Sequence, residues 1–466
     1  MLKLYNTLGR EVTEFQSIKE NSVSLYCCGP TVYNFAHIGN LRTYFFEDIL
    51  IKTLNYNNFH VKHCMNITDV GHLTDDGDDG EDKMIKASRD KGMDVYDIAK
   101  FFEKAFFEDT KSLNISRPDI VCRATKHIGD MIKLVKGLED KGFTYVSNGN
   151  VYFDTSKFPA YGSMAGLEKQ DLNYGASTAL DSAKKNPQDF VLWFTNSKFE
   201  NQAMQWNSPW GKGYPGWHLE CSAMSLKYLG DTFDIHCGGV DHVNIHHTNE
   251  IAQTEAYTGK KWVNRWLHGE FLVNKTGKMS KSKDGFLTLQ TLVDKGYKPL
   301  DYRYFLLGAH YRTQLTFSWE SLDGAKSALK SIRNKISLLL EKDDIGLIES
   351  IGDSGKKYLD NFVTHINEDL NTPRCLADLW DLLKDKSVPA CDKLAVINQM
   401  DKILSLDLLT LEKEICTDKR LLKLLENRNE ARLNKDYALS DKIRDELLEE
   451  GWVVKDSGNG SVLERV

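Results

Sequence analysis

The sequence predicts an α/β protein with a Rossmann-type parallel sheet, followed by a helical bundle and a small C-terminal domain. The first indication lies at residues 23–67, where the patterns are those of a strand, a turn, a helix and a strand: "VSLYCC", "GPTVYNFAHIG", "NLRTYFFEDILIKTLNY" and "HVKHCMNI". A second strand and turn, "DTFDIHCGGVD", precede the helical pattern "NEIAQTEAYTG". Because such units build parallel sheets, we expect a ligand at the carboxyl ends of the strands.

The length of 466 residues, 41% of them hydrophobic, is enough for several domains. The patterns predict a sheet domain in two halves, 1–126 and 216–318, separated by a turn-rich connective insertion at 127–215. A nearly continuous helical pattern at 319–410 predicts a bundle, with a loop at 344–357 inside it. The remaining segment, 411–466, has a charged helix and a β-like end and is expected to form the C-terminal domain.

Composition excludes several classes of protein. Sixty Lys and Arg against 67 Asp and Glu give a formal net charge of −7, so any site for a polyanion must be local. Nine scattered cysteines, an odd number, indicate reduced thiols rather than a disulfide framework. The start is not patterned as a signal peptide, and no apolar run approaches the ~18 residues of a membrane span. We therefore expect a soluble cytoplasmic protein with no membrane segment, and a monomer.

Residues 275–285, "KTGKMSKSKDG", alternate four lysines with small residues. Taken alone, such a run is more often a solvated loop than a phosphate site. The phosphate interpretation gains weight from "AHIGN" at 36–40, because His37 there lies at the start of a helix whose N–H groups can receive an anion. Gly39 would let a nucleotide lie close to the backbone.

"HIGN" and "KMSKS" (278–282) resemble the two signature motifs of class I aminoacyl-tRNA synthetases, usually HIGH and KMSKS. Further stretches, in the same order from Leu4 to Arg312, are similar to cysteinyl-tRNA synthetases: "LYNTL", "CGPTVYN", "NITDVGHLTDD", "GWHLECSAM", "FDIHCGGVDH", "HHTNEIAQ" and "YFLLGAHYR". "ARLNKDYALSDKIRDEL" extends the resemblance toward the C-terminus. The resemblance implies a ligase that activates L-cysteine with ATP and Mg²⁺ and transfers it to tRNA(Cys).

The resemblance also implies that the lysine loop closes on ATP while pyrophosphate departs, because cations at the developing charge lower the barrier. It assigns the catalytic roles to His37, Asn40, Lys278 and Lys281. The expected nucleotide contacts are His37, Gly39, Asn40, His236, Lys278, Ser280 and Lys281, with His236 near the adenine. Asn40 departs from the usual histidine of HIGH; an amide can still donate hydrogen bonds but cannot become cationic.

From spacing alone a zinc site is weakly indicated. The sequence has no CxxC pair, and a scattered cysteine is more often a small core residue. His246 and Glu250 share one face of a helix, although such a pair is commonly a surface hydrogen bond. By their places in "CCGPT", "GWHLECSAM" and "HHTNE", the resemblance implies the zinc ligands Cys28, Cys221, His246 and Glu250. Such a zinc ion would select the cysteine thiolate, whereas one missing methylene discriminates by only ~1–3 kcal/mol.

The resemblance places four more residues at the bound cysteine together with Cys28: Gly29, Thr68, Trp217 and Asp241. Trp217 would wall the side-chain pocket, although a core aromatic is an equal alternative. Asp241 would accept a hydrogen bond from the substrate ammonium; the alternative is an ordinary turn residue.

The tRNA assignment comes from the resemblance, since nothing in 411–466 is strongly basic. Leu463 stands where relatives often have a Trp that could stack on a base. Two alternatives stay open. One is a cysteine ligase of the mycothiol pathway with the same catalytic core, which would not need the C-terminal region. The other is a non-catalytic tRNA-binding or zinc-sensing relative, which would not need intact "HIGN" and "KMSKS".

Overall fold

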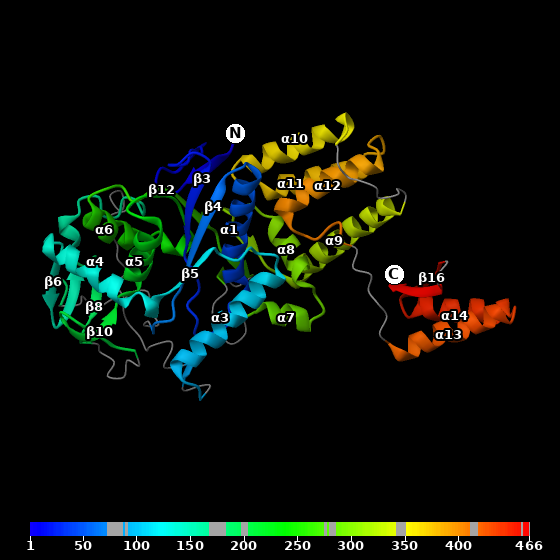
Figure 1. Cartoon of the computed structure of the whole chain (residues 1–466), viewed down its shortest axis with the longest axis horizontal. Helices are drawn as coiled ribbons and strands as arrows, with labels where there is room; N and C mark the ends of the chain where they lie inside the picture. The colour runs from blue at the N-terminus through cyan, green and yellow to red at the C-terminus, as the bar shows by residue number, and fades with distance from the viewer. Residues whose placement is uncertain are drawn as a thin grey trace. The chain divides into compact units, whose positions relative to one another are not determined.

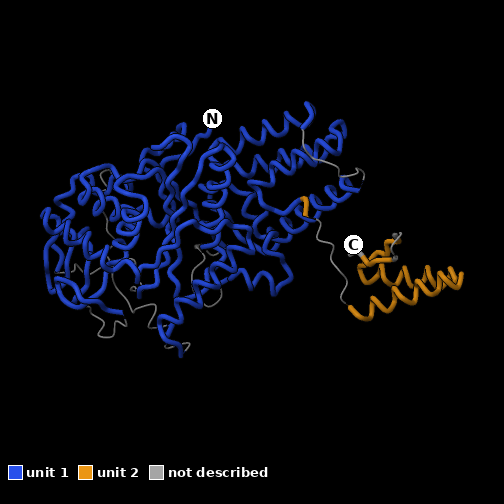
Figure 2. The backbone as a smooth tube through the Cα atoms, viewed as in Figure 1, with its two compact units in different colours: residues 1–408 blue, residues 409–466 orange. Residues whose placement is uncertain are grey.

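The computed structural model describes residues 1–71, 87–88, 92–166, 183–196, 204–274, 286–341, 351–410, 418–456 and 461–463, and the backbone of 277–278, 457, 460 and 464–465. The chain forms two compact units, residues 1–408 and residues 409–466 (Figure 2). The boundary between the units lies beside the expected start of the C-terminal domain at 411. The other expected domain boundaries fall within the first unit, and they stay predictions.

A five-stranded parallel sheet is the centre of the first unit, in the order β12-β11-β3-β4-β5. The strands are β3 (Ser22–Cys27), β4 (His60–Ile67), β5 (Ile120–Arg123), β11 (Phe233–Gly239) and β12 (Val263–Gly269). From β3 the chain builds outward to β4 and β5, and it later returns to the other side of β3 with β11 and β12. The strand order therefore reverses between β3 and β11, which is where open parallel sheets bind ligands. The predicted fold class is confirmed.

Helices cover both faces of this sheet (Figure 1). Helix α1 (Ile38–Tyr56) joins β3 to β4 on one side, and α4 (Ile128–Asp140), α5 (Trp217–Leu229) and α6 (His246–Thr258) pack together on the other. Helix α3 (Val95–Ser112) joins β4 to β5. Helix α6 packs against α4 and α5, and every side chain from His246 to Thr254 is buried, polar ones included.

The insertion consists of α4 and an antiparallel sheet in the order β6-β7-β8-β10-β9. Its strands are β6 (Thr144–Ser147), β7 (Asn150–Phe153), β8 (Phe190–Phe194), β9 (Trp206–Ser208) and β10 (Gly211–Pro215). Strand β10 ends at the residue before Gly216, the N-cap of α5. The insertion therefore delivers the chain directly to the helix that carries Cys221.

Beyond β12 the chain forms a small sheet and the helices of the junction and bundle. The remaining elements of this unit are β1 (Lys3–Asn6), β2 (Glu11–Glu14), β13 (Leu272–Asn274), β14 (Gly277–Lys278), β15 (Leu315–Thr316), α7 (Leu289–Asp294), α8 (Pro299–Leu307), α9 (Trp319–Leu340), α10 (Asp353–Asn367), α11 (Thr372–Lys384) and α12 (Ala390–Leu404).

The loop expected at 344–357 is wrong at its end, because α10 begins at Asp353. Asp392 of α12 accepts hydrogen bonds from Gly352 N (3.2 Å) and Ser354 Oγ (2.7 Å), which fixes the start of that helix; residues 342–350 lie outside the described part.

Buried polar contacts join the bundle to the sheet domain. Arg303 of α8 has no exposed surface; it pairs with Asp48 of α1 at 2.8 Å and donates to the carbonyls of Leu404 and Leu113 at 2.7 Å. At the end of α10, Asp369 accepts hydrogen bonds from Tyr5 N, Tyr311 Oη and Arg312 Nε at 2.7–2.8 Å. Such side chains are costly to leave unpaired, so they hold the helices in one arrangement.

The second unit has a core of its own. Helices α13 (Lys419–Leu433) and α14 (Tyr437–Glu449) pack on the antiparallel hairpin of β16 (Trp452–Ser457) and β17 (Gly460–Arg465). The buried side chains are Leu421, Leu425, Ile443, Leu447, Trp452 and Leu463. Leu463 is 6% exposed, so its side chain belongs to this core. Among the helices described in either unit, none has the length and apolar character of a membrane span.

Candidate functional site

A cavity of about 210 Å³ lies at the carboxyl ends of β3 and β11. Its walls come from the turn after β3, the start of α1, the start of α5 and the end of β11. Eight residues singled out from the sequence line it: Cys28, Gly29, His37, Asn40, Trp217, Cys221, Asp241 and His246. Segments some 200 residues apart in the chain therefore meet where the strand order reverses.

The floor of the cavity is a buried cluster of two thiols, an imidazole and a carboxylate. Cys28 follows β3, Cys221 lies in α5, and His246 and Glu250 lie one turn apart on α6. One ligand atom of each lies within 4.8 Å of the others. The Sγ atoms of Cys28 and Cys221 are 3.9 Å apart, and all four residues are at most 5% exposed. The structure thus brings together the four residues that the resemblance implied as ligands.

Electrostatics in the cluster favour the charged form of the carboxylate. Burial opposes ionisation of Glu250, but the neighbouring His246 and His236 lower its pKa to about 2. Burial likewise disfavours the imidazolium of His246, yet Glu250 raises the pKa of that ring to about 10. Burial, and then the contact with Cys221, raise the pKa of the Cys28 thiol. Burial also acts to raise the pKa of Cys221, but hydrogen bonding to Cys28 and the neighbouring His246 lower it overall.

The residues fit a zinc ion. Glu250 Oε1 lies 2.6 Å from Nε2 of His246, but it has no hydrogen-bonded partner of normal geometry among the described residues. A ligand atom of each of these two residues also lies within 4.8 Å of the two sulfurs. Two thiolates, one imidazole and one carboxylate are ligands that tetrahedral zinc accepts. A buried anionic group of this kind needs a compensating cation.

Neighbouring histidines hold the cluster in place. His218 Nδ1 lies 2.9 Å from Nδ1 of His246, and His247 Nε2 lies 3.3 Å from the sulfur of Cys28. His268 in turn contacts His247: Nε2 of His268 lies 2.7 Å from Nδ1 of His247. Such outer contacts orient metal ligands. Sequence reasoning missed them, because a lone histidine in a strand or helix carries no signal of what it touches.

Two other groups of side chains in this region are also close enough to hold one ion. They are Cys28, His242, His246 and His247, and Cys28, His236, His247 and Glu250. Each has one sulfur, whereas the cluster described above has two. Soft metal sites are favoured by thiolates, so Cys28, Cys221, His246 and Glu250 form the better zinc site.

His236 is packed inside the protein. Its side chain has no exposed surface, its Nε2 lies 2.9 Å from Glu250 Oε2, and its ring stacks on Trp266 with centroids 4.6 Å apart. This contact places the His236 ring beside Glu250, and the expected position of His236 near the adenine stays a prediction. Thr68 is also buried, and its Oγ1 donates to Glu220 Oε2 at 2.7 Å; its assignment as a cysteine contact stays a prediction.

The rim of the cavity is formed by the start of α1. His37 is the N-cap residue: its Nδ1 accepts a hydrogen bond from Asn40 N at 3.0 Å, and Asn40 Oδ1 accepts one from His37 N at 3.3 Å. Because Nδ1 accepts, a neutral His37 carries its proton on Nε2. A Cβ atom at Gly39 would lie 2.9 Å from the His37 ring, so glycine is needed there. Asn40, where HIGH has histidine, thus closes a capping box.

The side walls contain three of the expected substrate contacts, Trp217, Asp241 and Gly29, whose roles stay predictions. Trp217 begins α5, and its ring centroid lies 4.3 Å from that of His246. Asp241 is exposed in the short helix η4 (Val240–His242) after β11. Gly29 N donates to Asn66 Oδ1 at 2.8 Å, and a Cβ at Gly29 would meet Asn66 O at 1.7 Å, so only glycine lets the chain turn here.

The lysine loop is held to neighbouring backbone at two places. Within it, the backbone of Lys278 lies in β14 and pairs with Val273 of β13. After it, Leu287 O accepts a hydrogen bond from Ile38 N at 2.8 Å, and Thr288 bridges to His37. Ser280, Lys281 and the side chain of Lys278 lie outside the described residues, so their expected phosphate contacts stay predictions.

Arg42 is a further site residue that sequence reasoning missed. It lies on α1 with 4% of its surface exposed and donates to four backbone carbonyls. They belong to Glu270 (2.9 Å), Phe271, His310 (3.3 Å) and Thr313. The guanidinium therefore fixes the helix of the HIGN motif to the segment that leads into the lysine loop. A single arginine on an apolar helix gives no such signal in sequence.

Comparison with known proteins agrees with this geometry. The family of tRNA synthetases class I (C) catalytic domains matches residues 14–327. Cysteine–tRNA ligase of Treponema denticola is 51% identical, with 98% of each chain covered. The chain belongs to the cysteine–tRNA ligase family. Another member, from Borrelia hermsii, is 47% identical over the full length of both chains.

Solved structures with a similar fold are also class I synthetases. Methionyl-tRNA synthetase of Mycobacterium tuberculosis, in complex with methionyl-adenylate, has a TM-score of 0.57 and 13% identity. The match covers 83% of this chain and 91% of that one. At this identity the similarity concerns the fold alone. The sequence matches between this member of the cysteine–tRNA ligase family and its curated relatives extend through the second unit as well as the first.

Replacing Arg42 tests its role at the junction. In Arg42→Lys, one ammonium cannot serve four carbonyls on two segments, and a buried acceptor left unpaired costs ~1–3 kcal/mol. We expect faster hydrogen exchange at 271–274 and a free energy of unfolding lower by ~2–4 kcal/mol. Arg374→Lys, at a side chain that is 61% exposed, is the control and should change neither quantity. Parental exchange at 271–274 in Arg42→Lys would show that the hydrogen bonds of Arg42 do not hold the segment.

The metal assignment predicts one zinc ion per purified chain. In Cys221→Ser a hydroxyl that stays protonated at neutral pH replaces a thiolate, so zinc content should fall sharply. Elemental analysis after dialysis against a weak chelator measures it. Cys375→Ser, at another buried cysteine, should keep the metal. Equal zinc in Cys221→Ser and the parent would rule out Cys221 as a ligand.

Proposed function

We propose that this chain is a cysteine–tRNA ligase. It joins L-cysteine to ATP, forming cysteinyl-adenylate and pyrophosphate, and then transfers the cysteinyl group to tRNA(Cys) with release of AMP. The observation that carries this proposal is the buried set of Cys28, Cys221, His246 and Glu250 directly below the HIGN rim. It combines, in one cavity, a place for a thiol and a place for phosphates.

Selection of cysteine follows from the chemistry of the cavity floor. We assign one zinc ion to Cys28, Cys221, His246 and Glu250; when bound, it offers a soft Lewis-acid site that prefers a thiolate over a hydroxyl or a methyl group. The protein's own part is to keep the four ligands in register, through His236 on Glu250, His218 on His246 and His247 on Cys28.

The remaining groups of cysteine fit the walls. The carboxylate of Asp241 is exposed at the cavity and suits a charge-assisted hydrogen bond with the substrate ammonium. The Trp217 ring borders the His246 ring and excludes water from one side of the thiol. Gly29 leaves room for the substrate backbone beside the turn after β3. These contacts would aim the carboxylate of cysteine at the rim.

The rim supplies donors for ATP. In the first step the cysteine carboxylate attacks the α-phosphorus and pyrophosphate leaves, so negative charge grows on phosphate oxygens. His37 Nε2–H, the amide of Asn40 and the N-terminal end of α1 supply neutral donors there. Lys278, Ser280 and Lys281 would close over the phosphates from the loop, with Mg²⁺ on the pyrophosphate oxygens.

The second unit and the bundle are the proposed contacts for tRNA beyond the catalytic domain. A cysteine ligase that uses a small amine acceptor, such as that of the mycothiol pathway, would not need the second unit. The curated relatives match this chain over 98–100% of its length, which favours tRNA as the acceptor. Since Leu463 is part of the core of that unit, base stacking there would have to use other side chains.

Replacing Lys281 tests the clamp. In Lys281→Ala, loss of one charge-stabilising donor should slow cysteine-dependent exchange of pyrophosphate into ATP by ~10²–10³-fold. The KM for cysteine should change little, because the lysine acts on phosphate. Lys275→Ala removes another lysine of the same segment and should retain the parental rate. If Lys281→Ala exchanges pyrophosphate as fast as the parent, the clamp assignment is wrong.

A chain ending at Thr410 tests the role of the second unit. The residues of the cavity all lie within the first compact unit, so pyrophosphate exchange should stay within about threefold of the parent. Charging of tRNA(Cys) should fall by at least ~10²-fold, as expected when several cations that bind phosphates are removed. Circular dichroism would verify that the shortened chain is folded. Full charging by this chain would remove the second unit from tRNA binding.

A further inference from the structure

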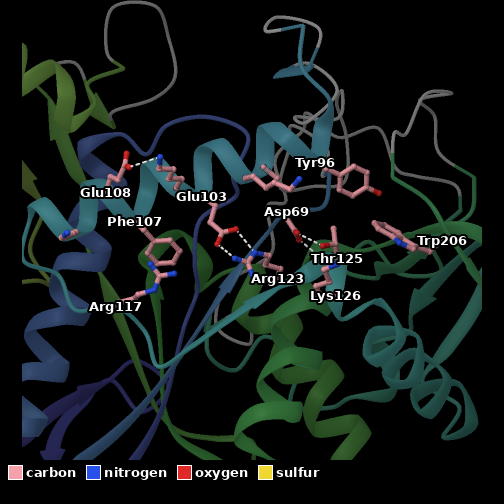
Figure 3. Close-up of a pocket in the computed structure, with 14 residues that line it drawn as sticks. Asp69, Tyr96, Glu103, Phe107, Glu108, Arg117, Arg123, Thr125, Lys126 and Trp206 are labelled. Atoms are coloured by element: carbon pink, nitrogen blue, oxygen red, sulfur yellow. Dashed lines mark hydrogen bonds and ion pairs between the residues drawn. The ribbon is translucent and has the colours of Figure 1, made fainter.

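A second and larger cavity, of about 850 Å³, lies beside the carboxyl ends of β4 and β5 (Figure 3). One wall is the exposed face of α3, from Tyr96 to Lys111; the other is the chain around β5, from Arg117 to Lys126. Trp206, the first residue of β9, also lines it. We call this cavity the α3 groove.

The α3 groove is positively charged although the chain as a whole has a net charge of −7. The lining includes three carboxylates, Asp69, Glu103 and Glu108, and a larger set of exposed cations: Lys100, Lys104, Lys111, Arg117, Arg123 and Lys126. The excess of cations makes an anion the fitting occupant.

Two of these carboxylates are committed inside the protein. Asp69 is 7% exposed and accepts hydrogen bonds from Thr125 N (2.8 Å) and Thr125 Oγ1 (2.6 Å). Glu103 is 8% exposed and accepts one from Arg123 Nε at 2.7 Å. Figure 3 shows both pairs below α3. Glu103 thus neutralises Arg123, and Asp69 is held below the surface, so the charge that the groove presents to solvent comes from the other cations.

Three of the cations have no carboxylate partner within the described part of the chain: Lys111, Arg117 and Lys126. The guanidinium of Arg117 lies over the Phe107 ring, 4.0 Å from its centroid, which holds it in place without neutralising it. Glu108, the third acid, lies 3.7 Å from Lys104.

Aromatic rings accompany these charges. Figure 3 shows Tyr96 and Trp206 toward one end of the groove, and Arg117 over Phe107 toward the other. Tyr96 is 47% exposed, and Trp206 is half-buried. Cations along a groove, with exposed aromatic faces beside them, suit single-stranded nucleic acid, because phosphates meet the cations while bases stack on the rings.

The α3 groove is next to the catalytic cavity. Phe102 and Phe106, on the other face of α3, line that cavity, and Asp69 follows β4 at the same edge of the sheet. An RNA end that delivers a hydroxyl to the adenylate has to pass close to this edge. A polyanion lying along α3 would approach the reaction centre from the side.

We propose that the α3 groove binds the 3′ end of the tRNA acceptor arm, with Lys111, Arg117 and Lys126 on its phosphates and Tyr96 and Trp206 on its unpaired bases. This inference rests on the proposed function, since it concerns the acceptor of that reaction. It adds a binding surface, separate from the cysteine cavity, that is needed for transfer and not for adenylate formation.

The doubly substituted full-length chain Lys111→Glu/Lys126→Glu tests the proposal. Both side chains are exposed, so reversal of their charge should leave the fold and tRNA-independent pyrophosphate exchange within about twofold of the parent. The kcat/KM for charging tRNA(Cys) should fall by at least ~10-fold, mainly through the KM for tRNA. Lys19→Glu, a charge reversal at an exposed lysine just before β3, should charge tRNA as the parent does.

Binding measurements with a hairpin RNA of the acceptor arm, carrying its unpaired 3′ end, give a second readout. The slope of log K against log salt concentration should be smaller for the double variant, by about 0.7 for each phosphate of the single strand that the variant no longer neutralises. Trp206→Ala should weaken the hairpin with the unpaired end and leave a blunt hairpin unaffected. A merely structural effect of Trp206 would weaken both RNAs.

The outcomes separate this inference from the proposed function. If the parent shows no cysteine-dependent pyrophosphate exchange, the proposed function fails. If the parent exchanges and charges normally, and the double variant charges with the parental KM and salt slope, the groove assignment is overturned. A different ligand would also overturn it. If the parent binds polyglutamate but not the hairpin, and the double variant binds neither, the groove takes an acidic protein and not RNA.

Discussion

Burial of Glu250 beside two thiols and an imidazole, where the strand order reverses, is the constraint on which the site depends. A carboxylate with no exposed surface is costly unless other groups compensate its charge. Here the compensation comes from His246 and His236, which lower the pKa of Glu250 to about 2 against the effect of burial. A zinc ion would replace the proton that makes His246 cationic and would supply the compensating charge itself, and the same ion would select the substrate thiol. Stability of the interior and choice of substrate are thus two consequences of one cluster.

That cluster requires three elements to meet within a few ångströms. Cys28 follows β3, Cys221 is carried by α5, and His246 and Glu250 are carried by α6. The insertion brings the chain back at Gly216, so that α5 starts beside the turn after β3. The sheet then places α6 behind the cavity through β11. A change in the packing of any one element would separate the ligands.

A second set of buried polar side chains relates the cavity to the rest of the first unit. Arg42 ties α1 to the segments around β13 and after α8, and Arg303 ties α8 to α1 and to the end of α12. Helix α1 therefore carries His37 at its start and receives the bundle along its length. The position of the HIGN end relative to the bundle is thus set by buried hydrogen bonds and ion pairs on one helix.

The sequence by itself determined the fold class, the order of the elements and the identity of the residues around the cavity. Alternation of strand and helix patterns is a local property, so β3, α1, β4 and β11 could be located from it, and the motifs specified Cys28, His37 and Glu250. It could not show what a buried side chain touches. His236 is an example, because its motif gives no sign of the buried contacts that its ring makes with Glu250 and Trp266. The start of α10 was missed because Asp392, distant in sequence, fixes it. Only the tertiary structure decided the roles of Arg42 and the charge of the α3 groove, since hydrogen bonds and surface charge depend on residues that meet only after folding.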